Sequence, residues 1–379
     1  MDLRQTGFHS RTAALGATFA EYADYDFPSQ YAADITDEYW ACRQRAVIMD
    51  LTPLRKVEVS GPGAGALLQA TVTRDLRRLG DGHIVYTGLC DDDGNLLDDG
   101  TVFRFGPERF RWVGYTDEDL DWFEKHAQRL GLDASFENST DRLHNIAVQG
   151  PASRDIVNAA VSTPEGRASV PELTWFRFTE GRIGGPDGPE AVVSRTGYSG
   201  ELGYEIWCHP SDGPAVWDAV WAAGEPHGMA PLGLDALDLV RVDAGLIFKG
   251  YEYEGAEDPF EAGIGFVVTK GKEDDFVGKA ALKRRRENPT QALVGLEVEG
   301  RDAVAHGDAV LAAGENAGVV TSGTFSPGLD KNLALARVRI GHASLGERLE
   351  VQRADGASPL AATVVRFPFY DPDKTRPRS

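Results

Sequence analysis

Hydrophobic residues recur along this chain with two periods, and both occur through roughly the first 280 positions. Apolar spacing of three and four residues is typical of helices. It predicts helices over 36–46, 62–72, 117–131, 151–161, 215–228 and 234–245, with Thr36 capping the first. Short apolar or alternating runs bounded by Gly and Pro predict strands over 47–51, 55–61, 83–90, 96–106, 144–150, 188–197 and 202–209. Because these elements mix without long parallel βαβ repeats, the predicted fold class is α+β.

The pattern changes after about residue 290, where short strands alternate with glycine-containing turns. Strands are predicted over 292–300, 317–327, 334–341, 347–353 and 361–367. Many short strands with regular turn signals are typical of a small all-β unit. We therefore expect a C-terminal β-barrel-like domain.

The charge balance excludes several classes of partner. The chain carries 59 acidic and 39 basic residues, a formal net charge of −20. Nucleic-acid binding needs a basic surplus, so no nucleic-acid partner is expected, and an anionic membrane is disfavoured as well. No apolar run approaches the roughly 20 residues of a membrane span, and the N-terminal residues lack a signal-peptide h-region. With three scattered cysteines, the simplest interpretation is a cytoplasmic protein.

The stretch DDDGNLLDDG at 91–100 holds five aspartates. A calcium loop of the EF-hand type needs oxygen ligands at fixed positions, Gly at position 6 and Glu at position 12. Neither register, with Gly94 or Gly100 at position 6, meets this pattern. The 8 histidines are scattered without ligand spacing, so no metal site is predicted.

The Asp-Gly pair at 93–94 instead predicts a β-hairpin with a two-residue type I′ turn. In that register Gly88 faces Asp99, and Tyr86 faces Thr101. A glycine opposite Asp99 leaves room beside the backbone for a ligand. Tyr86 lies diagonally next to Asp99 on the same face.

Strand alternation separates the two aspartates at 98 and 99. Asp99 shares the more apolar face with Leu97 and Phe103, whereas Asp98 is predicted to face Arg104 and water. The aspartates at 91–93 are interpreted as solvated turn residues. A carboxylate on an apolar face needs a partner or a chemical role. Asp99 is therefore a functional candidate, and its alternative is a structural carboxylate bound to a buried Arg or to backbone N–H groups.

A second acidic candidate is Glu205, which alternates with Tyr204 and Ile206 along a predicted strand. An inward Glu can accept two parallel hydrogen bonds from an amidine-like or guanidine-like edge, and a pterin ring has such an edge. The alternative is an ion pair with a nearby arginine, such as Arg195 or Arg241.

Eight segments in order resemble the T-protein of the glycine cleavage system, the aminomethyltransferase, and its folate-dependent relatives. They are MDLTPLRKVEVSGP at 49–62, GNLLDDGTVFRF at 94–105, VQGP at 148–151, RTGYSGELGYEI at 195–206, PLGLDALDLVRVDAGL at 231–246, DPFEAGIGFVV at 258–268, DFVGKAAL at 275–282 and TSGTFSP at 321–327. The resemblance runs from about residue 9 to 372. No single segment is decisive, but the ordered set is specific.

The resemblance implies a three-domain cloverleaf with tetrahydrofolate in a central channel. The expected domains are a discontinuous folate-binding domain at 1–54 and 145–275, a domain carrying the Asp hairpin at 55–144, and the C-terminal β domain at 276–379. Residue by residue, Asp99 matches the family's catalytic Asp, Tyr86 the Tyr beside the folate, and Glu205 the Glu that holds the pterin. Leu54, Thr101 and Arg241 are also expected at the folate site.

The chain departs from the glycine cleavage pattern at three places. Thr-Pro-Leu at 52–54 replaces Ser-His-Met, Asp-Asp-Gly at 98–100 replaces Asp-Asp-Leu, and Leu237 stands where an Arg is usual. The pterin Glu is kept. The departures favour a reaction that moves a carbon from a small N-, S- or O-methylated donor to N5 of tetrahydrofolate. The missing side chain at Gly100 is predicted to mark the difference in donor.

The predicted protein is thus a tetrahydrofolate-dependent one-carbon transferase in which Asp99 orients the reactants and takes or relays a proton. One alternative is a T-protein that acts on the aminomethyl-lipoyl H-protein, for which KRRR at 283–286 is either a docking patch or a solvated helix face. The other is a non-catalytic folate-binding relative. The signature of that relative has a Cys, which KGYEYEG at 249–255 lacks.

Overall fold

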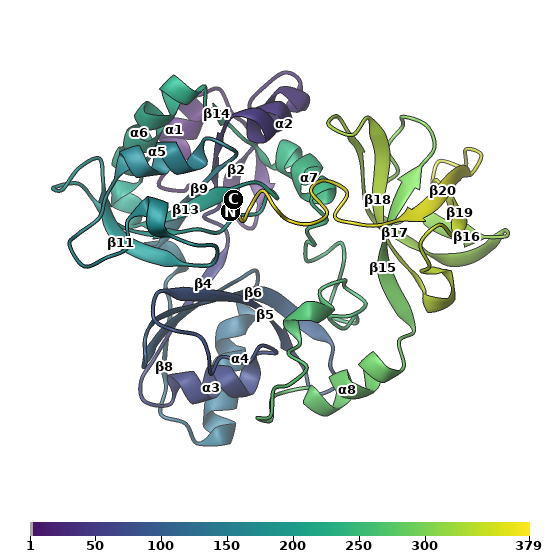
Figure 1. The fold of residues 1–379 in the computed structure, drawn as a ribbon, viewed down its shortest axis with the longest axis horizontal. Helices are drawn as coiled ribbons and strands as arrows, with labels where there is room; N and C mark the ends of the chain where they lie inside the picture. The colour runs from purple at the N-terminus through teal and green to yellow at the C-terminus, as the bar shows by residue number, and fades with distance from the viewer. Residues whose placement is uncertain (1–2) are drawn as a thin grey trace.

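Three lobes are arranged around a common centre in the computed structural model, which describes residues 3–379 (Figure 1). The first lobe, at the upper left, holds a seven-stranded sheet, the second, below it, a five-stranded sheet, and the third, at the right, a closed barrel. The chain leaves the first lobe for the second, returns, and then enters the barrel. Apart from His144, each sheet falls inside one of the three predicted domain ranges, whose boundaries stay a prediction.

The first lobe is a sheet covered by helices on both faces. Its strand order is β10-β11-β12-β13-β9-β3-β14. The strands are β3 (Val47–Asp50), β9 (His144–Gln149), β10 (Val161–Ser162), β11 (Phe178–Ile183), β12 (Glu190–Ser194), β13 (Gly203–Cys208) and β14 (Ala230–Pro231). Helices α1 (His9–Ala14), α5 (Ser153–Ala160) and α6 (Gly213–Gly224) border the core formed by the Tyr204 and Ile206 face. Helices α2 (Ile35–Gln44) and α7 (Leu234–Asp243) pack on the opposite face, beside Met49 and Ala147.

The second lobe carries the predicted Asp hairpin. Its strands are β4 (Arg55–Ser60), β5 (His83–Cys90), β6 (Leu96–Gly106), β7 (Arg109–Gly114) and β8 (Ser135–Asn138), in the order β5-β6-β7-β4-β8. Helices α3 (Ala64–Thr71) and α4 (Glu118–Leu130) cover one face of this sheet with a core that contains Leu68, Phe123, Val102 and Trp112. The hairpin's other face therefore remains for contact with the first lobe.

The third lobe confirms the predicted barrel. Strands β15 (Gln291–Val298), β16 (Ala309–Ala312), β17 (Glu315–Ser326), β18 (Lys331–Arg339), β19 (Arg348–Gln352) and β20 (Leu360–Val365) close in the order β15-β18-β17-β16-β19-β20. Closure leaves no free sheet edge, and valine and alanine side chains fill the interior. Helix α8 (Lys279–Glu287), which contains the KRRR run, precedes the barrel.

Several local predictions need correction. Helix α2 begins at Ile35, and its cap is Asp34, whose carboxylate accepts the N–H of Thr36, rather than Thr36 itself. The KRRR run is not only a solvated face, because Arg285 bonds to Asn95 and lies 3.6 Å from Asp258. The hairpin of β1 (Thr18–Tyr22) and β2 (Tyr25–Gln30), like β7, β8 and β16, was not predicted. These strands are only four to six residues long, and so short a run gives too weak a periodic signal.

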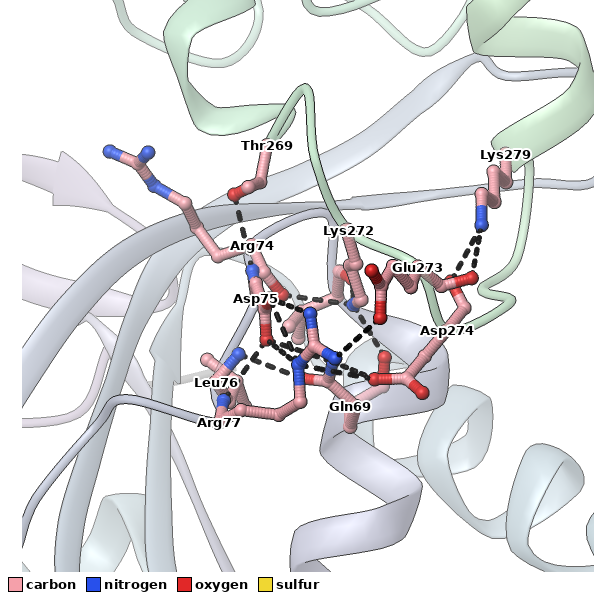
Figure 2. Close-up of polar contacts among 11 residues, drawn as sticks. Gln69, Arg74, Asp75, Leu76, Arg77, Thr269, Lys272, Glu273, Asp274 and Lys279 are labelled. Carbon is pink, nitrogen blue, oxygen red and sulfur yellow. Dashed lines mark hydrogen bonds and ion pairs between the residues drawn. The ribbon is translucent and has the colours of Figure 1, made fainter.

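A polar clip fastens the second lobe to the segment before α8 (Figure 2). The guanidinium of Arg77 lies 2.6 Å from Asp75, 3.3 Å from Glu273 and 3.6 Å from Asp274. The buried ammonium of Lys272 donates to three backbone carbonyls, including those of Val72 at 2.7 Å and Arg74 at 2.9 Å. The clip fixes the turn between α3 and β5, and with it the start of the Asp hairpin. Among the helices of residues 3–379, none is long and apolar enough to cross a bilayer.

Candidate functional site

The hairpin pairs in the predicted register, although its turn differs from the prediction. Tyr86 faces Thr101 and Gly88 faces Asp99, as expected. Gly94 has a φ of +83°, and the N–H of Gly94 bonds to the carbonyl of Asp91, so the loop has three residues rather than the two of a type I′ turn. A bulge next to Leu89 restores the register after this extra residue.

Asp91 is a structural residue of this loop. Its carboxylate accepts the N–H groups of Asp93 at 3.0 Å and Asn95 at 2.9 Å, and the amide of Asn95 at 2.8 Å. The prediction that all three turn aspartates are merely solvated is therefore wrong for Asp91.

Asp98 is fully buried, which corrects the prediction that it faces Arg104 and water. Its carboxylate accepts the N–H of Tyr115 at 2.7 Å, the N–H of Asp99 at 3.0 Å and the hydroxyl of Tyr253 at 3.2 Å. The ammonium of Lys249 lies 3.9 Å away. Backbone donors from a neighbouring strand end thus compensate the burial, and Asp98 holds Asp99 in place.

Gly100 lies on the same face of β6 as Asp98, inside the second lobe. A Cβ at this position would lie 2.3 Å from the carbonyl oxygen of Val113 and 2.7 Å from the Trp112 ring. Gly100 is therefore required by packing inside the second lobe, and the predicted role in donor choice is wrong.

Asp99 lies on the opposite face of β6, half-buried, between two tyrosine hydroxyls. Tyr86 donates to its Oδ2 at 2.6 Å, and Tyr253 donates to its Oδ1 at 2.6 Å. Burial and the negative charge of Asp98 raise the pKa of Asp99 to about 6, and the two hydroxyls limit that rise. In the described part of the chain, neither a buried Arg nor a backbone N–H binds this carboxylate. The alternative that Asp99 is a structural carboxylate held by such groups is therefore wrong.

Glu205 lies on β13 and points away from the Tyr204 and Ile206 core, as alternation predicted. It is 9% exposed. Burial raises the pKa of Glu205 to about 7. A hydrogen bond from the Thr196 hydroxyl and the positive charge of Lys56 favour the carboxylate and limit this rise.

The predicted ion-pair partners of Glu205 bind elsewhere. Arg195 donates to the carbonyl of Leu173 at 2.9 Å and to carbonyls of the C-terminal segment. Arg241 pairs with Glu252 at 3.0 Å and Asp238 at 2.7 Å. No Lys or Arg nitrogen of residues 3–379 lies within 4.0 Å of the Glu205 carboxylate. The ion-pair alternative is therefore wrong.

The faces that carry the two acids meet. Trp207 shares the Glu205 face of β13, and Phe103 shares the Asp99 face of β6. The two rings contact edge to face, with centroids 5.6 Å apart. Leu54 packs against the same apolar cluster, at the join between the first and second lobes. Thr101 lies half-exposed between Asp99 and Phe103 along the strand. Glu205 and Asp99 thus lie on faces of two separate sheets that pack against each other at Phe103 and Trp207.

Arg241 was predicted to bind the cofactor, but its guanidinium is occupied by other groups of the protein. Its guanidinium is 2% exposed and donates to Glu252, Asp238, the carbonyl of Leu246 and the hydroxyl of Ser322 at 2.8 Å. Because Ser322 belongs to the barrel, Arg241 joins the first lobe to the third. These contacts occupy the guanidinium with protein acceptors.

The sequence-based predictions missed two residues near these acids, Tyr253 and Lys56. Tyr253 bonds to Asp99 from 154 residues away, so only the fold brings them together. Tyr253 belongs to KGYEYEG, a segment from which only the absence of a Cys was used in the prediction. Lys56 is fully buried, donates to the carbonyl of Thr52 at 2.7 Å, and has a pKa lowered by burial to about 7. The burial of Lys56 could not be predicted, because a lysine next to Arg55 on a strand is normally expected to face solvent.

Residues 8–272 match the family described as the GCVT N-terminal domain, and residues 291–371 match the glycine cleavage T-protein C-terminal barrel domain. The chain therefore belongs to the glycine cleavage T-protein family, as its sequence motifs predicted.

Relatives of known name carry two different descriptions. A trimethylamine-oxide aldolase of Ruegeria pomeroyi is 49% identical over 99% of this chain, which spans 48% of that protein. This chain thus covers about half the length of that relative. An aminomethyltransferase of Rubrobacter xylanophilus is 37% identical over 97% of this chain and 94% of its own length. The crystal structure of the glycine cleavage aminomethyltransferase T from Bartonella henselae superposes with a TM-score of 0.86 at 25% identity, covering 97% of this chain and 98% of that one. The fold is thus that of the T-protein.

Proposed function

We propose that this protein is a tetrahydrofolate-dependent enzyme that transfers a one-carbon unit from a small N-methylated amine to the folate. One observation carries the proposal: Asp99 and Glu205 lie on faces of two sheets that meet at Phe103 and Trp207, and no side-chain cation of residues 3–379 pairs with either carboxylate. Two such carboxylates suit a ligand with an amidine-like edge at one end and a positive reaction centre at the other.

The residues fit tetrahydrofolate. Glu205, nearly buried and without an ion-pair partner, matches the amino-pyrimidine edge of the pterin, and Leu54, Thr101 and Tyr86 provide apolar and polar walls. The guanidinium of Arg241 is occupied by Glu252 and Ser322, so the role proposed for it is structural rather than a direct contact with the folate. When bound, tetrahydrofolate supplies N5, the nitrogen that accepts the one-carbon unit.

Asp99 is proposed as the catalytic residue. With a pKa of about 6, its carboxylate is ionised near neutral pH yet basic enough to take a proton at Oδ1 or Oδ2. The hydroxyls of Tyr86 and Tyr253 fix both oxygens, so the carboxylate is oriented before the reactants arrive. In this half-buried position its charge also stabilises a cationic donor.

The donor assignment rests on charge and on relatives. Asp99 with its tyrosines offers a negative, aromatic surrounding that suits an ammonium or iminium group. The Ruegeria relative, at 49% identity, is named for a methylated amine oxide. The second candidate is the T-protein reaction on the aminomethyl-lipoyl H-protein, favoured by relatives named aminomethyltransferase that match almost end to end.

The two donors can be separated in one assay. The protein is incubated anaerobically with tetrahydrofolate and 13C-methyl-labelled amines, sulfonium compounds or aryl methyl ethers, with and without H-protein. Label that reaches the folate from an amine without H-protein supports the proposal. Strict dependence on H-protein supports the T-protein reaction instead. Tight folate binding without transfer from any donor would identify a non-catalytic folate-binding protein.

A further inference from the structure

Lys56 places a positive charge at the join between the first and second lobes without an ion-pair partner. Its side chain is fully buried, and its ammonium makes one hydrogen bond, to the carbonyl of Thr52 at 2.7 Å. No carboxylate oxygen of residues 3–379 lies within 4.0 Å of this nitrogen. An ammonium has three N–H donors, and its burial is costly when they are not paired with an acid. Because an apolar residue would stabilise the fold at least as well, the charge itself is expected to have a use.

The side chain of Lys56 extends from the face of the second lobe that carries Asp99. In the β6–β7 register Thr101 faces Val113, and in the β4–β7 register Val113 faces Lys56. Residues that face each other across neighbouring strands point to the same side of a sheet. Because Thr101 and Asp99 lie two residues apart on β6, Lys56 shares with Asp99 the side of the sheet that meets the first lobe.

The ammonium of Lys56 lies beside the tryptophan that follows Glu205 on the same face of β13. Its nitrogen is 5.7 Å from the centroid of the Trp207 ring, a distance at which a cation and an indole attract each other. Asn145 faces Trp207 in the β9–β13 register. Both polar atoms of the buried Asn145 amide lack a hydrogen-bond partner in the described part of the chain. The surroundings of Trp207 thus combine a buried cation with an unpaired buried amide.

Two hydroxyl groups connect Trp207 to Glu205. The indole N–H donates to Ser194 Oγ at 3.1 Å, and Ser194 Oγ lies 2.7 Å from Thr196 Oγ1. The Thr196 hydroxyl in turn bonds to the Glu205 carboxylate. An indole nitrogen only donates, so the protons of both hydroxyls remain available to point toward Glu205. This chain of hydrogen bonds favours Glu205 as an acceptor, which means as the carboxylate, but it supplies no charge.

The charge states of Lys56 and Glu205 depend on each other. Burial lowers the pKa of Lys56 to about 7, and burial raises the pKa of Glu205 to about 7 against the charge of Lys56. The charged and titratable groups that face Lys56 are Asp50, Arg55, Arg111, His144 and Glu205. Of these, His144 is neutral at pH 7, because burial lowers its pKa to about 4. Since Glu205 and Lys56 attract each other only when both are ionised, the carboxylate–ammonium pair is the state between their two titration steps.

We infer that Lys56 is a positioning residue of the folate site, which holds Glu205 in its ionised form for the amino-pyrimidine edge of the pterin. This inference rests on the proposed function. An ionised Glu205 accepts two N–H groups of that edge, whereas a protonated Glu205 would point a hydrogen at one of them. Because Lys56 is fully buried, it acts on Glu205 through its charge and through Trp207, without touching the folate.

The test follows the dissociation constant of tetrahydrofolate from about pH 6 to about pH 9 by anaerobic calorimetry. Wild type is compared with Lys56→Met, Lys56→Gln and Lys56→Arg, of which the last keeps the charge. Lys272→Met is the matched control. Lys272 is also a buried lysine whose pKa is lowered by burial to about 7, but it lies in the clip of the second lobe (Figure 2). Thermal unfolding checks that each variant folds.

A second measurement needs no ligand. The 13C chemical shift of the Glu205 carboxyl group is followed by NMR through the same pH range in the folate-free protein. Glu205→Gln identifies the signal. This titration reports the pKa of Glu205 in wild type and in each variant, whether or not the protein binds folate.

We expect loss of the charge in Lys56→Met and Lys56→Gln to raise the pKa of Glu205 by about one pH unit. Both variants should then bind tetrahydrofolate about five-fold more weakly than wild type at pH 7. At pH 9 the affinities should be nearly equal, because Glu205 is ionised there in every protein. Lys56→Arg and Lys272→Met should keep the Glu205 pKa of wild type.

Two results would overturn this inference alone. One is an unmoved Glu205 pKa in a folded variant without the Lys56 charge. The other is a loss of folate affinity that is the same at every pH, because it would show a merely structural role. Failure of the wild type to bind tetrahydrofolate would overturn the proposed function, and the NMR titration would still decide whether Lys56 controls the charge of Glu205.

Discussion

Removing the Tyr253 hydroxyl should raise the pKa of Asp99 and move the pH dependence of the reaction with it. The hydroxyl donates to Asp99 Oδ1 at 2.6 Å, and a donated hydrogen bond stabilises the ionised carboxylate more than the neutral acid. A hydrogen bond to a charged group contributes roughly 1.5–3 kcal/mol, and one pKa unit corresponds to about 1.4 kcal/mol. Tyr253→Phe should therefore raise the pKa of Asp99 from about 6 by roughly one to two units.

The assay is the pH profile of kcat/KM for one-carbon transfer, whose acid limb reports an essential base of the free enzyme. Asp99 works as the carboxylate, so activity falls as the pH drops through its pKa. The wild-type limb is expected at about pH 6, and the limb of the variant at higher pH. Tyr86→Phe should act in the same direction, because Tyr86 also donates at 2.6 Å.

Tyr25→Phe is the control for losing a buried hydroxyl, because the Tyr25 hydroxyl has no hydrogen-bond partner among the residues described. It should leave the limb where the wild type has it. A limb that is unmoved in Tyr253→Phe, or moved to lower pH, would refute the assignment of Asp99 as the base.

Three further predictions concern Asp99, Glu205 and Gly114. Asp99→Asn should lower turnover by about 10²–10⁴-fold with little change in the tetrahydrofolate dissociation constant, and full turnover in a steady-state assay would contradict its catalytic role. Tetrahydrofolate should bind more tightly at pH 8 than at pH 6, because Glu205 has a pKa of about 7 and binds as the carboxylate, and calorimetry should find this dependence lost in Glu205→Gln. Gly114→Ala should destabilise the fold in urea by about 1–3 kcal/mol or more, because the new Cβ would lie 2.5 Å from Asp119 and 2.6 Å from Asp98. Gly106→Ala, with open space around it in the same lobe, should be nearly neutral, and equal losses in both would contradict the packing at Gly114.

The hairpin shows how far local pattern could lead. Strands β5 and β6 have the predicted bounds, because long alternating runs give a strong signal. The register was right although the turn was not, since a three-residue loop and a bulge at Leu89 compensate each other. Turn type depends on one backbone angle at Asp93, which composition alone does not determine.

The candidate site was predictable where one strand defines it, and not where distant segments meet. Alternation placed Asp99 and Glu205 correctly on their faces. Alternation wrongly predicted that Asp98 faces solvent. The groups that bind Asp98 in the interior, the N–H of Tyr115 and the hydroxyl of Tyr253, come from other segments of the chain. The partners of Arg195 were misjudged for the same reason, because they are the carbonyls of Leu173 and of the C-terminal segment. Arg241 instead pairs with Asp238 and Glu252, which lie three and eleven residues away along the chain.

Asp99 and Glu205, from two different sheets, are proposed to bind the two ends of one pterin. The decisive experiment is a crystal structure of the tetrahydrofolate complex. We expect it to show the amino-pyrimidine edge on the Glu205 carboxylate and N5 within hydrogen-bond reach of Asp99. A folate bound elsewhere, or a pterin that reaches only one of these carboxylates, would contradict it.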